Sequence, residues 1–254
     1  MVEELNLSEK QEKKNRKKRT IRVLVIILTL AAVFGALRLQ QYLQEQKEAG
    51  AETADYPDYL EKLSVPEYEG SAWVEVNNGL TFFDTAAETA EPYEHYGELD
   101  KLGRCTFAEA CLGPELLPED PREEISSVIP TGWQNTKYDF IEDGFLYNRC
   151  HMIAFMLTGQ NANEKNLVTG TRYMNVEGML PNEIRVADYI RESGNHVHYR
   201  VTPVFHGADL LASGILIEAR SVEDHGTGLC FCVYCHNVQP GVVIDYATGK
   251  NHLE

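Results

Sequence analysis

The sequence is poor in positive charge over most of its length, and it has no internal repeat. Residues 1–37 hold eight of the 23 Lys and Arg residues and four of the 39 Asp and Glu residues. Residues 38–254 therefore carry 15 basic and 35 acidic side chains, a net charge of −20. Because affinity for a phosphate backbone comes from Lys and Arg, this shortage argues against tight nucleic-acid binding by the whole surface. The lack of a repeat excludes solenoid architectures.

Long apolar runs are also scarce. One run of 15 residues contains no charged side chain: VLVIILTLAAVFGAL at residues 23–37. The basic cluster KKNRKKR precedes it and Arg38 follows it, so residues 21–38 can just span a bilayer if the flanking arginines snorkel. The basic side stays inside, which predicts a cytoplasmic tail over 1–20, a transmembrane signal-anchor over 21–38, and an extracellular remainder at the cell membrane. A cleaved secretory signal is the alternative, but the obvious cleavage site would place Phe34 at its −3 position.

The rest of the chain divides into a linker and a folded domain. Residues 39–70 are rich in Gln, Glu and Ala, which predicts a stalk or linker, and we expect the domain to span 71–254. Three strand-like runs joined by short turns predict an antiparallel meander near the C-terminus. The fold class is therefore α+β: a mostly antiparallel sheet with a strand–loop–helix insert. The predicted elements are a strand pair around the NNG turn at 77–79, strands within 102–113, 144–155 and 167–171, helical structure over 172–193 with a fresh start at Pro181, and meander strands within 196–205, 210–222 and 228–238.

The stretch FLYNRCHMIAF at 145–155 places an arginine and a histidine two residues apart on a predicted strand. Residues two apart point to one face, so Arg149 and His151 should stand side by side while Asn148 and Cys150 face the other way. A strand that delivers a His, followed by a loop and a helix whose first turn delivers an Asn, can hold one hydrated Mg²⁺ beside a general base. The histidine would activate water, and the arginine would meet phosphate charge.

Residues 147–202 resemble the DNA/RNA non-specific endonucleases of the ββα-metal (His-Me finger) type, and among them the nucleases that Gram-positive bacteria use for DNA uptake. The family's D-R-G-H strand end reads Asn148-Arg149-Cys150-His151 here. The resemblance implies that His151 is the general base and that Arg149 is the family's catalytic and substrate-binding arginine. Asn148 and Cys150 depart from the pattern, which puts any orienting role of the missing Asp in doubt.

The segment NEKNLVTGTRYMN is similar to the family's metal segment. The resemblance implies that Asn175 binds the metal directly and that Asn166 is a second, supporting metal-site residue. Glu183 falls where members carry a catalytic Glu that is hydrogen-bonded to metal waters. The implied cofactor is one Mg²⁺ per site, with Mn²⁺ as an alternative, and the implied reaction is hydrolysis of DNA, with RNA as an alternative substrate.

Arginines gather around the insert although the domain is acidic. Arg149, Arg172 and Arg185 are the candidate substrate-binding residues, with Arg191 and Arg200 nearby in sequence. The acidic residues concentrate at 41–70, 84–124 and 218–224. We therefore expect weak, salt-sensitive binding of nucleic acid.

Six cysteines in an exported domain predict disulfides, although their pairing does not follow from the sequence. Two other functions stay open. The altered hallmark allows a non-catalytic exported nucleic-acid-binding module of the same fold. The run CFCVYCH allows a zinc-stabilised interaction module, but on a strand Cys235 faces away from Cys230 and Cys232, and a second ligand pair at zinc-knuckle spacing is missing. His196 and His198 are expected on a strand surface.

Overall fold

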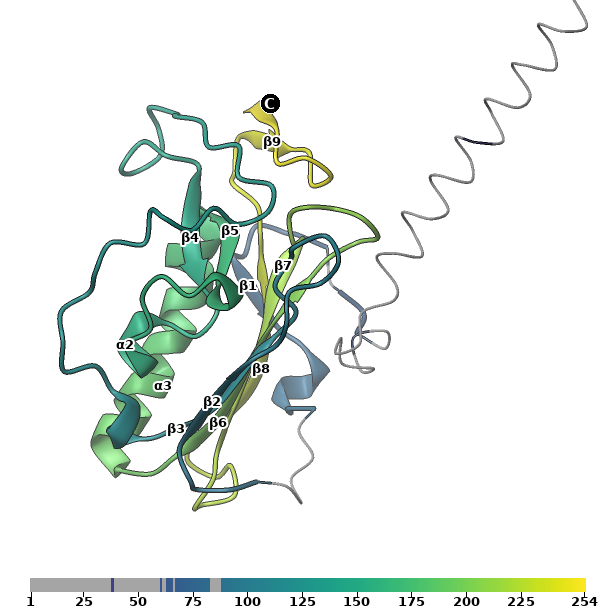
Figure 1. Cartoon of the computed structure of the whole chain (residues 1–254). Helices are drawn as coiled ribbons and strands as arrows, with labels where there is room; N and C mark the ends of the chain where they lie inside the picture. The colour runs from purple at the N-terminus through teal and green to yellow at the C-terminus, as the bar shows by residue number, and fades with distance from the viewer. Residues whose placement is uncertain (1–37, 39–59, 61–62, 66, 83–87) are drawn as a thin grey trace, which may run out of the picture. The chain divides into compact units, whose positions relative to one another are not determined.

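A computed structural model describes residues 38, 60, 63–65, 67–82 and 88–254 (Figure 1). The predicted tail at 1–20 and nearly all of the predicted span at 21–38 lie outside these residues. Within the described part of the chain, no helix is both long enough and apolar enough to cross a membrane.

A six-stranded antiparallel sheet forms the centre of the domain, in the order β1-β8-β7-β6-β3-β2. The predicted meander is confirmed, because β6, β7 and β8 pair in sequence order with Val201 opposite Ile217 and Ile217 opposite Val233. The predominantly antiparallel α+β class is therefore confirmed for the described domain. The six strands are β1 (Trp73–Glu75), β2 (Tyr93–Tyr96), β3 (Ala108–Leu112), β6 (Val197–Val204), β7 (Gly214–Ser221) and β8 (Cys230–His236).

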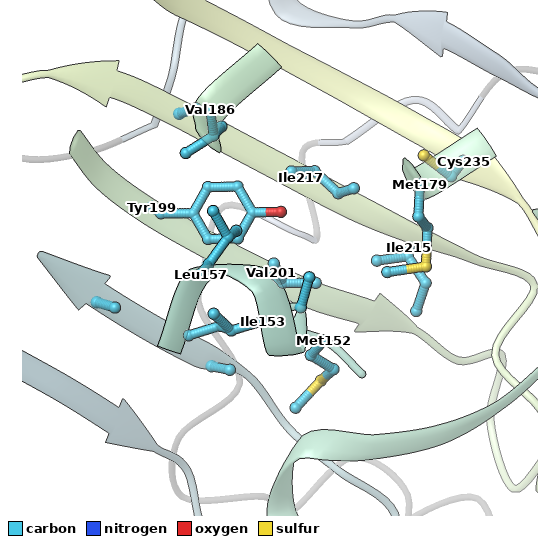
Figure 2. Packing of buried hydrophobic residues seen from close by; sticks show 14 of the residues in the cluster. Met152, Ile153, Leu157, Met179, Val186, Tyr199, Val201, Ile215, Ile217 and Cys235 are labelled. Atoms are coloured by element: carbon cyan, nitrogen blue, oxygen red, sulfur yellow. The ribbon is translucent and has the colours of Figure 1, made fainter. Parts of the chain in front are cut away.

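One face of this sheet is covered by the helix α3 (Leu180–Ser193) and the short helix α2 (Phe155–Thr158), as Figure 1 shows. Alternation along the strands explains the contact, since every second residue points to the helices. On β6 these residues are Val197, Tyr199 and Val201, all fully buried. Figure 2 shows Tyr199, Val201, Ile215 and Ile217 of the sheet facing Leu157 of α2 and Val186 of α3.

The opposite face of the sheet has a second, smaller core. Leu216, Cys232 and Tyr234 point to this side, and Leu60, Leu63 and Val65 pack against them although they belong to the expected linker over 39–70. Arg200 and the fully buried Glu218 also lie here, joined at 2.9 Å. Charged residues of the central strands are therefore directed away from the helix-bearing face.

The predicted insert is present as a two-stranded ribbon followed by a helix. Strand β4 (Tyr147–His151) pairs antiparallel with β5 (Leu167–Thr171), and the 3-10 turn η5 (Glu164–Asn166) lies between them. A π-helical segment, η6 (Met174–Met179), leads directly into α3. Pro181 lies in the first turn of α3, but helical backbone at Met179 and Leu180 continues η6 into α3, so the helix changes from π to α here and does not break as the sequence predicted.

The sequence misjudged three other segments. Residues 77–79 form a 3-10 turn, η2 (Asn77–Gly79), instead of a hairpin, because Asn77 and Asn78 both adopt left-handed backbone and β1 pairs with β8. Strand β2 was not among the predicted elements; it forms because β3 provides its partner. The last strands, β9 (Val242–Ile244) and β10 (Asn251–Leu253), form a separate ribbon, and the short turn η4 (Pro114–Leu116) follows β3.

Candidate active site

A cleft of about 910 Å³ lies at the ribbon–helix unit. Its wall contains five of the seven predicted site residues, supplied by β4, the helical residue directly after β5, η6 and α3: Arg149, His151, Arg172, Asn175 and Glu183. The structure therefore brings together residues that are separated by up to 34 positions in the sequence. Asn166 and Arg185 lie outside the cleft wall.

Strand β4 presents His151 and Arg149 to this cleft, as expected for residues two apart on a strand. Cys150 points the other way and is fully buried beside Gly170, where a β-carbon would approach the Cys150 sulfur to 2.5 Å. Gly170 is thus required for close packing of β4 on β5. Asn148 was expected to face away with Cys150, but it also lines the cleft. Its Oδ1 is buried and has no hydrogen-bond partner among the described residues.

The hydrogen bonds of His151 fix which ring nitrogen carries the proton. Nε2 lies 2.9 Å from the carbonyl oxygen of Asn161. A carbonyl can only accept, so Nε2 donates and the neutral ring keeps its lone pair on Nδ1. Burial lowers the pKa of His151; the hydrogen bond to Asn161 opposes this effect, and the charge of Arg122 adds to it. The side chain therefore favours the neutral form that a general base needs.

Arg122 is a residue of this site that the sequence did not indicate. One of its terminal nitrogens lies 3.4 Å from Nδ1 of His151, and the residue lines the cleft. Its positive charge also acts on Glu183, whose pKa it lowers. Arg122 lies in the acidic, Pro-containing loop after η4, 29 residues before His151, so no local pattern connects the two. Arg122 comes to lie beside His151 only through the tertiary fold.

Arg149 lies in the cleft, but part of its guanidinium is already engaged. Nε donates to the carbonyl of Val128 at 2.5 Å, and one terminal nitrogen donates to Ser126 at 3.2 Å. The guanidinium also lies over the ring of Trp133, 4.3 Å from its centroid. These contacts hold the charge in place and leave the other terminal nitrogen without a hydrogen-bond partner among the described residues. Arg149 therefore provides a fixed cation beside His151.

Arg172 lines the cleft, and two carboxylates from the turn before β4 share it. Its guanidinium lies 3.2 Å from Glu142 and 3.0 Å from Asp143. Both acids are largely exposed, so these ion pairs are weak in water and can exchange for a phosphate. Arg172 can thus meet substrate once its present partners are displaced.

Asn175 and Glu183 are the cleft residues that fit a hard divalent cation. The Asn175 amide makes no side-chain hydrogen bond within the described residues, although the residue lines the cleft. Glu183 is only 7% exposed, and its carboxylate has neither a hydrogen bond nor an ion pair among these residues. Burial raises the pKa of Glu183 to about 8, against the opposing charge of Arg122. A buried carboxylate without a partner beside a free amide oxygen is a donor set that suits Mg²⁺, which needs few protein oxygens.

Asn166, the expected supporting residue of the metal site, lies outside the cleft wall. It is fully buried, and its side chain accepts from Ile153 N–H at 2.8 Å and donates to Ile153 C=O at 3.0 Å. Its backbone oxygen accepts from Met152 N–H at 2.9 Å. The amide is thus occupied by backbone, and it fixes the chain where it leaves His151.

The remaining arginines are directed elsewhere, so Arg185 is corrected as a substrate-binding candidate. It lies over the ring of Phe231 at 4.3 Å and donates to Asn182, on the side of α3 that meets the sheet. Arg191 is exposed beside Asp188, and Arg200 belongs to the buried pair with Glu218. Nearness in sequence did not place these charges at the cleft, because α3 and β6 turn them to other surfaces.

All six cysteines are free thiols, which corrects the expectation of disulfides. Five of them are buried, and Cys105, for example, donates to the carbonyls of Glu164 and Leu167 at 3.4 Å. Across the described part of the chain, no three His, Cys, Asp or Glu side chains are arranged to hold a metal ion. His196 bonds to Glu223 at 2.6 Å and lies 3.3 Å from Glu115.

The cleft therefore combines a neutral imidazole whose Nδ1 meets only Arg122, two oxygen donors that suit a cation, and three arginines. A base beside fixed positive charge can activate water against a phosphate diester. The same arrangement gives poor support to acyl transfer, because Cys150 is buried away from His151 and burial raises its pKa.

Comparisons with known proteins agree with this chemistry. A family model described as "DNA/RNA non-specific endonuclease" matches residues 84–223. The structure is similar to NucA from Streptococcus agalactiae with magnesium ion bound, at a TM-score of 0.65 and 26% identity, over 75% of this chain and 91% of that chain. NucA from the same organism with no metal bound has a TM-score of 0.65 and 25% identity, over 80% of this chain and 98% of that chain. Sda1 nuclease with bound zinc ion has a TM-score of 0.62 and 24% identity, over 72% of this chain and 96% of that chain. This similarity shows a shared fold. No curated protein matches the sequence.

Proposed function

The chain belongs to the DNA/RNA non-specific endonuclease family and is a metal-dependent nuclease, and from this premise we propose that it hydrolyses DNA with Mg²⁺ and with His151 as general base. The observation that carries the proposal is the state of His151. Its Nε2 is committed to the Asn161 carbonyl, so Nδ1 is the atom that can take a proton from water.

The other residues have distinct parts in this proposal. Asn175 and Glu183 would hold the metal, because both present oxygen atoms to the cleft that no described residue engages. When bound, Mg²⁺ would polarise the phosphate and stabilise the leaving oxygen. Arg149 and Arg122 would neutralise the charge that develops on the phosphate, since both guanidinium groups lie in the same cleft as the base. NucA with magnesium bound, at 26% identity, supports Mg²⁺ as the ion, with Mn²⁺ as the alternative.

The division of labour between base and metal residue is testable with two variants. His151→Ala removes the base but leaves the oxygen donors, so plasmid cleavage should fall by roughly 10²- to 10⁴-fold while Mg²⁺ still binds. Asn175→Ala should weaken Mg²⁺ binding itself, and excess Mg²⁺ should recover part of the rate. Arg185→Gln, on the helix but outside the cleft, is the matched control and should cleave like the wild type. Wild-type cleavage by both alanine variants would refute the assignment.

For substrate, we propose DNA with RNA as a second substrate, bound weakly and with strong salt dependence. Three arginines and two acids line the cleft, whereas the whole chain carries a net charge of −16. Attraction to phosphate is therefore local and screened within about 8–10 Å at physiological salt. Cleavage of plasmid and of single-stranded RNA, each measured across a salt series, would test the RNA substrate and the salt dependence.

For location, we propose the domain organisation that the sequence favours: tail 1–20 inside the cell, signal-anchor 21–38, linker 39–70, and nuclease domain 71–254 outside. The support is the basic cluster before the uncharged run at 23–37. Protease added to intact cells should remove the domain. Survival of the full-length chain, while surface control proteins are digested, would count against this topology.

A further inference from the structure

One large apolar side chain stands exposed in the charged cleft. Phe145 is 44% exposed and lines the same cleft as His151. It belongs to none of the hydrophobic clusters formed by the described residues. Its position, two residues before β4, gives it no role in burying the core. The ring is therefore available for contact with whatever occupies the cleft.

The turn that carries Phe145 is held in place at several points. Lys137 and Phe145 pair as an isolated antiparallel bridge, and Tyr138 N–H donates to Gly144 C=O at 2.9 Å. Asp143, in the left-handed region at φ 65°, ties the turn to Arg172 at 3.0 Å. A ring on a fixed turn loses little freedom on binding, which favours affinity.

A cation accompanies the ring. The exposed Lys137 ammonium lies over one face of the Phe145 ring, 4.6 Å from its centroid, so the opposite face is the one that a base can meet. Three other aromatic rings line the cleft: Trp133 is covered by Arg149 and packs against the core cluster that contains Leu146, Tyr147 is buried, and Phe155 is half-buried. Phe145 is therefore the ring with an exposed surface, and Lys137 is the cation next to it.

We propose that Phe145 stacks on an unpaired base beside the scissile phosphate, with Lys137 meeting a neighbouring phosphate, so that the site takes single-stranded or locally unpaired nucleic acid. This inference rests on the proposed nuclease function and names its substrate class. Base faces are covered by neighbours in a duplex and become available only when a base is unstacked. Every base has such a face, so stacking adds affinity without sequence preference. It also adds affinity without charge, which suits a chain of net charge −16.

The same turn provides a matched control. Phe140 is 56% exposed, does not line the cleft, and lies 5.7 Å from Tyr138 between ring centroids. Removing either phenyl ring takes away a similar exposed apolar surface from the same turn. A difference between Phe145→Ala and Phe140→Ala therefore reports on the cleft and not on the stability of the turn.

The test measures binding of the full-length chain carrying His151→Ala to two labelled single strands in Mg²⁺, one normal and one abasic at the central positions. Phe145→Ala should weaken binding of the normal strand by about 5- to 150-fold, the loss expected for one base–aromatic stack. It should leave binding of the abasic strand unchanged, because that strand has no base to stack. Phe140→Ala should change neither, Phe145→Tyr should retain the preference for the normal strand, and Phe145→Leu should lose it.

Equal weakening of normal and abasic strands by Phe145→Ala would overturn the inference, as would equal affinities of Phe145→Ala and Phe140→Ala for the normal strand. Retained preference in Phe145→Leu would also overturn it, because leucine has no aromatic face. Cleavage of plasmid and of single-stranded DNA by the wild-type chain in Mg²⁺ is measured alongside. If the wild type cleaves neither, the proposed function fails; if it cleaves and the strand preference does not depend on Phe145, only the stacking inference fails.

Discussion

At the scale of single residues, the environment of His151 makes a prediction about pH. The base must be neutral, so the rate should rise with pH through the pKa of His151 and then level off. Burial and Arg122 lower this pKa, so the midpoint should fall below the ordinary value of about 6.5. Arg122→Gln removes one lowering charge and should move the midpoint of kcat/KM to higher pH.

Arg185→Gln is the control for this profile, because that arginine lies on Phe231 outside the cleft. Its midpoint should equal that of the wild type. A midpoint for Arg122→Gln that stays in place, or moves to lower pH, would show that Arg122 does not act on the base.

Glu183 makes a second prediction, about stability without metal. Its pKa is about 8 in the folded chain and about 4.3 when unfolded, so the folded state binds this proton more tightly. The free energy of unfolding contributed by this group is therefore greatest below about pH 4 and falls as pH rises from there to 8. Glu183→Gln should remove that component of the pH dependence.

Thermal melts of metal-free wild type and Glu183→Gln from pH 5 to 8 would measure this difference. Mg²⁺ should raise the wild-type Tm more at pH 8 than at pH 5, because the ionised carboxylate is the form that binds a cation. If the Tm of the two proteins changed with pH in the same way, Glu183 would not be buried without a partner.

At the scale of elements, the contact between η5 and the end of β4 determines where His151 stands. Asn166→Ala would remove both hydrogen bonds to Ile153 and leave a buried N–H and C=O without partners. We expect a loss of about 2–4 kcal/mol in the free energy of unfolding, measured in urea. Excess Mg²⁺ should not restore it, since Asn166 is not at the cleft.

Asn175→Ala is the companion variant, because Asn175 makes no side-chain hydrogen bond among the described residues. It should change stability by under about 1 kcal/mol while weakening Mg²⁺ binding. If Asn166→Ala were as stable as the wild type and bound Mg²⁺ poorly, Asn166 would act on the metal itself and not on the backbone that positions His151.

At the scale of the whole molecule, the described domain is stabilised by three hydrophobic clusters, two of them on opposite faces of the sheet, and not by cross-links. All six cysteines are free, and burial raises the pKa of Cys105 to about 12. Reductant should therefore leave Tm unchanged, and thiol titration of the unfolded, unreduced chain should count six. A Tm that drops on reduction would show that disulfides form.

The sequence by itself determined the ribbon–helix unit, while its resemblance to a nuclease family pointed to His151, Asn175 and Glu183 as site residues. Alternation on a strand is a local property, so β4 and β5 could be predicted from neighbouring residues. His151 and Arg149 two apart on β4 had to share a face. The meander also followed from short turns between apolar runs.

Only the tertiary structure decided which charges meet at the cleft. Arg122 reaches His151 across 29 residues, the Asn161 carbonyl selects the ring tautomer, and Arg185 turns to Phe231 instead. The hairpin expected at 77–79 gave way because β8 pairs with β1. Such contacts depend on how separate elements pack, and burial then sets the pKa of Glu183 and leaves its carboxylate facing the cleft. Local patterns contain no information about these long-range neighbours.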